Sequence, residues 1–276
     1  MIRIFSILVG LFFTAAVSWS LLWDTIQLGK DGLPKSAAHE FGKAYDLKPL
    51  KLASDGPFGK FDKKQLKRGL EVYAGVCASC HSLQQVAYRS LVHAGFTGAE
   101  VKALAAKATI NAKDPLTGEL KDRPGLPADK FPPVVYAGIG SPPDLSLITK
   151  ARQGGAAYVY SLLTGYEASQ PAELIERFPD AKLKPDSGLH YNPYFANLNI
   201  AMAPPLASDD LVTYSDGTKA SKDQMAQDVS AFLVWTAEPE LDQRHQTGAW
   251  WVLFMLFATV LGYMSYRNIW AEKKGH

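Results

Sequence analysis

The sequence predicts a mainly α-helical domain with long irregular loops and a hydrophobic segment near each end of the chain. Three observations support this fold class. Apolar residues recur at helical spacing in several short stretches, proline and glycine crowd the segments between them, and two runs of about 20 apolar residues lie near the termini. At 276 residues and 47% hydrophobic content, the chain has room for one large domain or two small ones.

Residues 4–23 are almost unbroken apolar, with Arg3 before them and Asp24 after them. This pattern is typical of a signal peptide or of an N-terminal membrane anchor; the length of the run and the lack of an A-x-A triplet slightly favour the anchor. Positive charge at the start places the N-terminus in the cytoplasm. Residues 24–59 are polar and rich in glycine, proline and lysine, so we expect a linker and surface arm there.

The run C-A-S-C-H at residues 77–81 is the attachment signature of a c-type haem. Two thiols one helical turn apart can reach the two vinyl groups of one porphyrin, and the histidine that follows can bind the iron. We therefore expect one haem c, covalently attached through Cys77 and Cys80, with His81 as an iron ligand. Residues 61–76 have helical spacing after Asp62, a possible N-cap, so a helix should lead into this motif.

A redox dithiol and half of a zinc site are the competing interpretations of the two cysteines. The redox motif requires no following histidine, and a structural zinc site needs further Cys or His ligands at matching spacing. Cys77 and Cys80 are the only cysteines of the chain, so no second pair exists. Haem attachment also indicates an oxidising or extracytoplasmic compartment.

Short helices are expected over residues 99–109, 145–151 and 156–163. Many prolines and glycines lie between residues 111 and 144, which predicts a long irregular wrap rather than a sheet, suited to the edge of a haem crevice. Arg152 follows the second of these helices. Its guanidinium could bind a haem propionate, although an ordinary surface arginine is an equal interpretation.

Met202 is the candidate for the sixth iron ligand. It lies in I-A-M-A-P-P-L, where two prolines keep the chain out of a helix, as a ligand from a loop requires. Met225 falls in a helical pattern and is more typical of a core residue. His190 is the rival ligand, since His/His ligation also occurs, while His93 and His39 are more typical of surface groups.

A helix is predicted over residues 224–235, capped by Ser221, and we expect it to pack on the helix that precedes the haem motif. Residues 248–266 are uncharged and long enough to cross a membrane, with aromatic residues near both ends. Arg267, Lys273 and Lys274 follow and place the C-terminus in the cytoplasm. The formal charge is only +2 and no basic face stands out, so we expect no nucleic-acid partner.

Taken together, the sequence of residues 56–270 resembles the cytochrome c1 family, in an alphaproteobacterial form. The resemblance rests on G-P-F-G at residues 56–59, residues 65–69, the haem motif, P-P-D-L-S at 142–146, residues 151–152 and 158–166, residues 200–206, and residues 228–239. It implies that Met202 is the sixth ligand, that Arg152 contacts a propionate, and that Pro143 and Tyr158 line the pocket. Some bacterial relatives have an extra cysteine pair before the methionine; this chain has none, so its loop must be held in another way.

The resemblance implies a membrane-anchored monohaem subunit of the dimeric cytochrome bc1 complex. Such a subunit is not itself the catalytic site; it passes electrons from a Rieske iron–sulfur protein to a soluble or membrane-anchored cytochrome c, with cytochrome b as a further partner. We expect a haem domain over residues 60–246 on the periplasmic side of a bacterial inner membrane, a transmembrane helix over 247–270 and a cytoplasmic tail over 271–276. The alternative is an anchored c-type cytochrome shuttle or an oxidase subunit.

Overall fold

A computed structural model describes residues 2–31, 36–114, 117–138, 140–184, 187–271 and 273. The predicted tail residues Glu272 and Lys274 and one proline of the predicted wrap, Pro115, lie outside the described residues. The chain forms two compact units, Met1–Phe41 and Gly42–His276, which are treated separately below.

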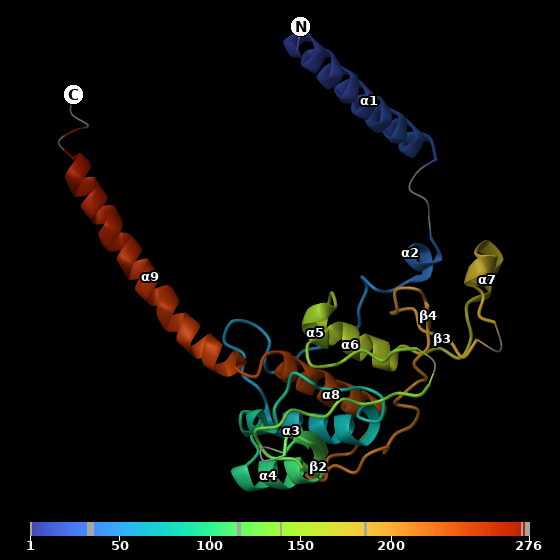
Figure 1. The fold of residues 1–276 in the computed structure, drawn as a ribbon, viewed down its shortest axis with the longest axis vertical. Coiled ribbons are helices and arrows are strands. Elements are labelled where there is room, and N and C mark those ends of the chain that lie inside the picture. The colour runs from blue at the N-terminus through green and yellow to red at the C-terminus, as the bar shows by residue number, and fades with distance from the viewer. Residues whose placement is uncertain are drawn as a thin grey trace. The chain divides into compact units, whose positions relative to one another are not determined.

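The first unit contains α1 (Ile2–Asp31) and the short α2 (Ala37–Phe41). The predicted hydrophobic helix is present, and residues 3–30 are long and apolar enough to span a membrane. The linker prediction was wrong for residues 24–31, which continue the helix (Figure 1). Residues 24–28 contain neither proline nor glycine, and the Thr25 hydroxyl donates to the Leu22 carbonyl, so nothing local stops the helix at Trp23.

The second unit is built around α8 (Lys222–Ala237), which is buried on most of its surface. It packs on α3 (Lys63–Val72), on α5 (Ile148–Ala151) and on α6 (Gly155–Thr164), and Figure 1 shows it between α3 and α6. A Cβ placed at Gly69 would lie 2.2 Å from the Asp228 carbonyl oxygen, so the backbones of α3 and α8 meet at that glycine. The predicted packing of these two helices is confirmed.

The core lies between α3 and α8, and its members include the fully buried Leu66, Met225, Phe232 and Trp235. The rings of Phe232 and Trp235 stack at 5.6 Å. Met225 is completely enclosed, as predicted for a core methionine.

Side-chain caps begin the main helices, because the first N–H groups of a helix have no partner within it. Asp62 accepts from the N–H groups of Lys64 and Gln65 at the start of α3. Ser221 accepts from Gln224 at the start of α8. The predictions of both caps are confirmed. A further helix, α4 (Gly98–Ala106), begins at a capping box formed with Thr97.

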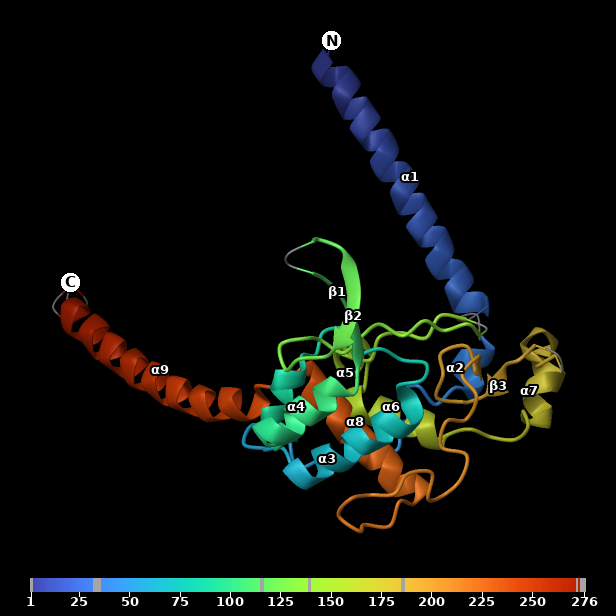
Figure 2. The same ribbon diagram turned by 60° about the horizontal axis from the view of Figure 1, so that its bottom comes forward.

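The predicted irregular wrap starts instead with an antiparallel hairpin, β1 (Thr109–Lys113) and β2 (Leu120–Pro124), with Lys113 opposite Leu120 (Figure 2). The prediction of no sheet was wrong here; in the connection Gly118 has a left-handed φ of 72°, a conformation that glycine adopts without strain. From Gly125 to Asp144 the described chain is irregular, as predicted, apart from a bridge of Lys130 with Ala87.

Short segments complete the second unit. They are the π-helical η1 (Tyr73–Cys77), the 3₁₀ turns η2 (Tyr88–Val92) and η3 (Pro179–Ala181), the helix α7 (Ala172–Arg177), and the two-residue strands β3 (His190–Tyr191) and β4 (Asn199–Ile200). The last helix, α9 (Leu241–Trp270), begins six residues before the predicted transmembrane helix of residues 247–270 and is long and apolar enough to span a membrane.

Candidate functional site

The two cysteines lie at the end of the helix that begins at Asp62. The π-helical turn η1 ends at Cys77, and the Cys77 carbonyl accepts from the N–H groups of Cys80, at 3.1 Å, and His81, at 2.9 Å. One further turn therefore follows Cys77 and brings the two thiols and the imidazole together. Both thiols are half-buried, and burial raises the pKa of Cys77 to about 12, so this residue stays a thiol at neutral pH.

The His81 ring is held through one nitrogen. Its Nδ1 lies 2.8 Å from the Pro143 carbonyl oxygen, which can only accept, so Nδ1 carries the proton. The lone pair of the neutral ring is then on Nε2, where a metal can bind. The Tyr73 hydroxyl donates to the His81 carbonyl at 2.8 Å and fixes the backbone of the same residue.

Ser82 ties the irregular segment 134–145 to the residue after His81. Its hydroxyl accepts from the Val134 N–H at 2.7 Å, and its carbonyl accepts from the Leu145 N–H at 2.9 Å. Both ends of the segment are thereby anchored beside the haem motif, which explains how Pro143 reaches the imidazole.

A groove of about 310 Å³ lies next to this histidine contact. Pro143, Leu147 and Ile148 give it apolar walls, and Arg152 lines it as the cation. Asp144 also lines the groove. Its carboxylate accepts from the backbone N–H groups of Gln84 and Ser146, at 2.8 and 2.9 Å, and these donors compensate its charge.

Arg152 and Tyr158 are brought together by a tight turn between α5 and α6. Gly154 and Gly155 have φ angles of 87° and 55°, a left-handed conformation that glycine adopts without strain. Burial raises the pKa of Tyr158, and the neighbouring Arg152 guanidinium opposes that rise. Arg152 itself is exposed and forms no ion pair with a carboxylate among the described residues.

Met202 lies in an irregular loop two residues after β4 and is half-buried. The Tyr166 hydroxyl donates to its backbone carbonyl at 3.0 Å. Burial raises the pKa of Tyr166, and the nearby Tyr158 hydroxyl adds to the rise. Tyr166 therefore lies between the Arg152–Tyr158 pair and the methionine loop.

Local contacts join several of the predicted site residues. His81 contacts Pro143, which lines one groove together with Arg152. Arg152 lies beside Tyr158. Tyr166 lies near Tyr158 and donates to the Met202 carbonyl.

The model of the family described as "Cytochrome C1 family" matches residues 52–273. The chain belongs to the cytochrome c1 family. It is 43% identical over 235 residues to cytochrome c1 of Rhodospirillum rubrum, an alphaproteobacterium, covering 79% of this chain and 85% of that protein. The mitochondrial cytochrome c1 heme protein of Saccharomyces cerevisiae is 42% identical over 227 residues, 79% of this chain and 68% of that protein. The predicted family resemblance is confirmed.

The residues present fit the haem that the name cytochrome c1 implies. A haem needs thiols for attachment, an imidazole with a free Nε2, an apolar surface and a cation for its carboxylates, and the site offers each of these. Val135 is 94% exposed and Leu147 48% exposed on the segments beside the groove.

The zinc alternative has no ligand set in the part of the chain that the structure describes, because no group of three or more His, Cys, Asp or Glu side chains lies together there. Among the histidines, His93 and His39 are exposed, as expected. His190 pairs with Ile200 and so lies close to the start of the Met202 loop. The two candidates for the sixth iron ligand, His190 and Met202, therefore lie in the same region.

Sequence reasoning missed Tyr73, Ser82 and Tyr166 as members of this cytochrome c1 site. Each side chain forms a hydrogen bond with a backbone group of another residue. Its residue type alone therefore does not mark it as part of a binding site.

Proposed function

We propose that this chain is the membrane-anchored haem subunit of a cytochrome bc1 complex and passes single electrons from a Rieske iron–sulfur protein to a c-type cytochrome. Membership of the cytochrome c1 family supports the role of haem subunit. The observation that carries the proposal is the hydrogen bond between His81 Nδ1 and the Pro143 carbonyl, which leaves Nε2 free for a metal beside a groove with apolar walls and the Arg152 cation. Tyr166 holds the carbonyl of Met202, the candidate thioether ligand, at 3.0 Å.

In this proposal Cys77 and Cys80 would attach one haem covalently, and His81 and Met202 would bind its iron. A bound haem would supply one-electron ferric and ferrous chemistry. His81 would bind through Nε2, because Nδ1 keeps its proton for the Pro143 carbonyl, and this hydrogen bond would also make the imidazole a stronger ligand. A thioether ligand favours the ferrous state, so Met202 would raise the reduction potential.

Three further residues bind the cofactor in this proposal. Arg152 offers a forked pair of donors to a propionate carboxylate, and no carboxylate of the described chain competes for it. Pro143 and Tyr158 pack against the porphyrin, which excludes water from the groove. With two protein ligands on the iron there is no open position for a substrate, so the chain transfers electrons and contributes no catalytic residue.

The long apolar helices support a membrane location for the subunit. We place α9 across a bacterial inner membrane, with the haem domain of residues 60–246 on the periplasmic side and the tail after Trp270 in the cytoplasm. The charges Arg267 and Lys273 at the end of α9 support this orientation, since cytoplasmic ends carry an excess of basic residues. In the same orientation α1 is an anchor or a signal peptide with a cytoplasmic N-terminus.

The connection to α9 favours a fixed subunit over the alternative of an anchored shuttle. Three residues separate α8 from α9, and Asp242 on α9 accepts from the Phe61 N–H at 2.9 Å and from Lys63 Nζ at 3.0 Å. His245 Nδ1 donates to the Gly59 carbonyl at 2.8 Å. A shuttle needs a flexible tether, whereas these bonds fasten the first turns of α9 to the haem domain.

The partners in this proposal are cytochrome b, the Rieske protein, a soluble or membrane-anchored cytochrome c and the lipid bilayer, within a dimeric complex. The test is a mild detergent purification from native membranes through a C-terminal tag, followed by a reduced-minus-oxidised spectrum and a quinol-to-cytochrome c assay. We expect b-type haem, a Rieske signal and inhibitor-sensitive activity to accompany the c-type band. A c-type haem alone, or one purified with an oxidase, would favour the shuttle or oxidase alternative.

A further inference from the structure

The loop that carries Met202 has little support of its own. Residues 201–208 follow β4 and include Pro204 and Pro205, which have no N–H to donate. Among the described residues, the only hydrogen bond of this segment runs from the Tyr166 hydroxyl to the Met202 carbonyl, at 3.0 Å. The buried side chain of Leu206 is its other anchor. The bond to Tyr166 therefore falls on the residue that most needs a fixed position.

Tyr166 is itself held firmly. It directly follows Gly165, where a Cβ would lie 2.3 Å from the Tyr194 ring and 2.5 Å from the Ser161 carbonyl oxygen, so the chain leaves α6 in close contact with its neighbours. The next residue, Glu167, donates its N–H to the Tyr191 carbonyl on β3 at 3.3 Å. The residues before and after Tyr166 are therefore both held in place, which limits the movement of its side chain.

The strand that leads to Met202 is attached to the same helix end. The side chain of the fully buried Asn192 donates to the Leu162 carbonyl of α6 at 2.8 Å. Its backbone N–H donates to the Leu198 carbonyl at 2.7 Å, which closes the turn between β3 and β4. Because β3 and β4 are docked on the end of α6, the strand that ends just before Met202 and the segment that carries Tyr166 are held together.

We propose that Tyr166 is a positioning residue for the axial thioether: its hydroxyl holds the Met202 loop so that the methionine stays bound to the haem iron. This inference rests on the proposed function, because it takes Met202 as the sixth ligand. In this chain, which has no cysteine pair near Met202, the hydrogen bond from Tyr166 would keep the loop rigid.

The test is binding of imidazole to the ferric holoprotein, in the full chain, because imidazole takes the sixth position only when the thioether leaves it. Tyr166→Phe removes one oxygen atom and keeps the ring. We expect apparent imidazole affinity to rise about fivefold, since one net hydrogen bond changes the open fraction by that factor. The far-red charge-transfer band of thioether-ligated ferric haem should weaken in parallel, and the midpoint potential should fall.

Tyr160→Phe is the matched control. Tyr160 lies on α6, the helix that precedes Tyr166, and its hydroxyl donates to Asp223 in the first turn of α8. This variant loses the same atom and should keep the wild-type imidazole affinity. A Tyr166→Phe variant that matches Tyr160→Phe in affinity, band and potential would overturn the inference.

The Met202→Leu variant distinguishes two results: that Tyr166 does not position Met202, and that Met202 is not an iron ligand at all. If the wild-type protein lacks the far-red band and binds imidazole as the leucine variant does, the ligand assignment and the inference fall together. If Tyr166→Phe does not accumulate as holoprotein, site-specific 3-fluorotyrosine at position 166 replaces it. That residue keeps the ring and is a better donor, so imidazole affinity should decrease; an increase or no change contradicts the inference.

Discussion

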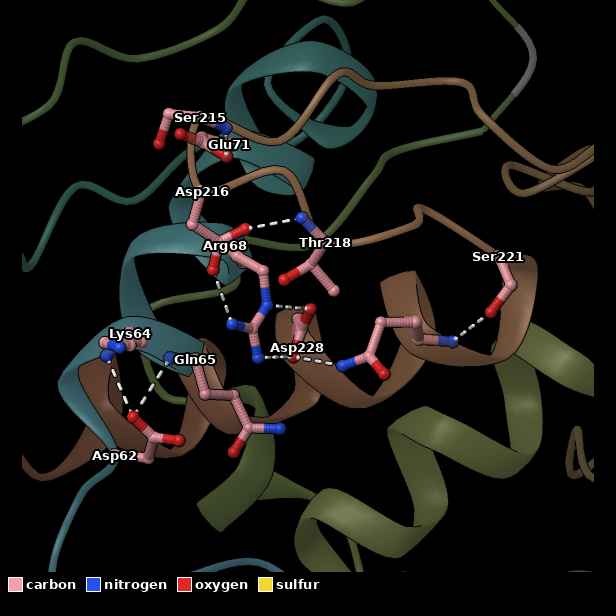
Figure 3. A network of polar contacts seen from close by, with 11 residues as sticks. Asp62, Lys64, Gln65, Arg68, Glu71, Ser215, Asp216, Thr218, Ser221 and Asp228 are labelled. Atoms are coloured by element: carbon pink, nitrogen blue, oxygen red, sulfur yellow. Dashed lines mark hydrogen bonds and ion pairs between the residues drawn. The ribbon is translucent and has the colours of Figure 1, made fainter.

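Asp228 is a carboxylate with no exposed side-chain surface, at the contact between α3 and α8. One of its oxygens accepts from Arg68 Nε at 2.8 Å, and the other accepts from Arg68 Nη2 at 3.2 Å and from Gln224 at 2.9 Å. Figure 3 shows Arg68 between Asp228 and Asp216, to which its Nη1 donates at 2.8 Å. These bonds raise the pKa of Arg68, so the guanidinium is charged at any working pH.

Replacing Asp228 by alanine should therefore strongly destabilise the protein. The change leaves the mostly buried Arg68 without its main partner, and breaking a buried pair in this way costs about 3–5 kcal/mol. Urea unfolding of the detergent-solubilised full chain, followed by circular dichroism, measures the loss. Asp216→Ala is the control: it removes a partly exposed member of the same network and should have a much smaller effect. Equal losses would contradict a dominant role for Asp228.

The charge of Arg152 should set part of the reduction potential. A cation near the haem opposes the extra positive charge of the ferric state, so Arg152→Gln should lower the midpoint potential. The shift is on the order of 70 mV, for a unit charge about 10 Å away at an effective dielectric constant near 20. A spectroscopic redox titration measures it, with Arg123→Gln as the control, because Arg123 is paired with Asp129. An unchanged potential in Arg152→Gln would remove this residue from the proposed cofactor site.

At the scale of elements, the crossing of α3 and α8 depends on the absence of a side chain at Gly69. Gly69→Ala would place a Cβ 2.2 Å from the Asp228 carbonyl oxygen and 2.5 Å from the Phe232 Cβ, in rigid surroundings. The two helices must separate, which costs about 1–3 kcal/mol or more, although alanine is the better helix former. Because α3 leads into the cysteines, the yield of haem-containing protein should fall too.

Gly98→Ala provides the comparison for that experiment, since a Cβ at Gly98 meets nothing within 4 Å. It should leave the unfolding midpoint and the haem yield unchanged or slightly raised. Thermal unfolding and the pyridine haemochrome spectrum give both quantities. If Gly69→Ala behaves like Gly98→Ala, close contact between the two backbones is not what the fold requires.

Elements with local signals could be predicted from the sequence, and those that depend on distant partners could not. The caps Asp62 and Ser221 lie directly before apolar residues at helical spacing, so α3 and α8 were predicted. The β1–β2 hairpin was missed, because the alternation in β1 is short and rests on only Ile110 and Ala112, and β2 is largely exposed with no alternation of apolar residues. Proline content alone wrongly suggested a continuous irregular wrap.

The site shows the same division. The motif at residues 77–81 and the methionine before two prolines carry their chemistry in residue type and spacing, so sequence alone nominated them. Tyr166 acts on a carbonyl 36 residues away, and Ser82 acts on backbone groups 52 and 63 residues away. No local pattern encodes such contacts, because the fold creates them.

At the scale of the whole molecule, the attachment of α9 decides whether the haem domain is fixed or tethered. Asp242 and His245 bind the segment before α3, and Leu241 is buried at the first turn of the helix. The buried Leu241 side chain and three hydrogen bonds thus fix the first five residues of α9 to the rest of the domain. A subunit that must present its haem to two protein partners in a fixed complex benefits from such a connection.

Trypsin provides the test, because Arg244 lies between those two anchoring residues in α9. Cleavage there requires local unfolding, so the detergent-solubilised wild-type chain should be cut after Arg244 far more slowly than after Lys182 in the exposed segment that follows η3. Replacing both Asp242 and His245 by alanine removes the hydrogen bonds and should accelerate cleavage after Arg244 by roughly tenfold or more, at about 1 kcal/mol for each bond. The rate after Lys182 should not change, which controls for protease activity and global stability. Fragment masses followed over time give both rates.

If the wild-type chain is cut as quickly after Arg244 as after Lys182, the first turns of α9 form a flexible tether, and the anchored shuttle becomes the better interpretation of this cytochrome.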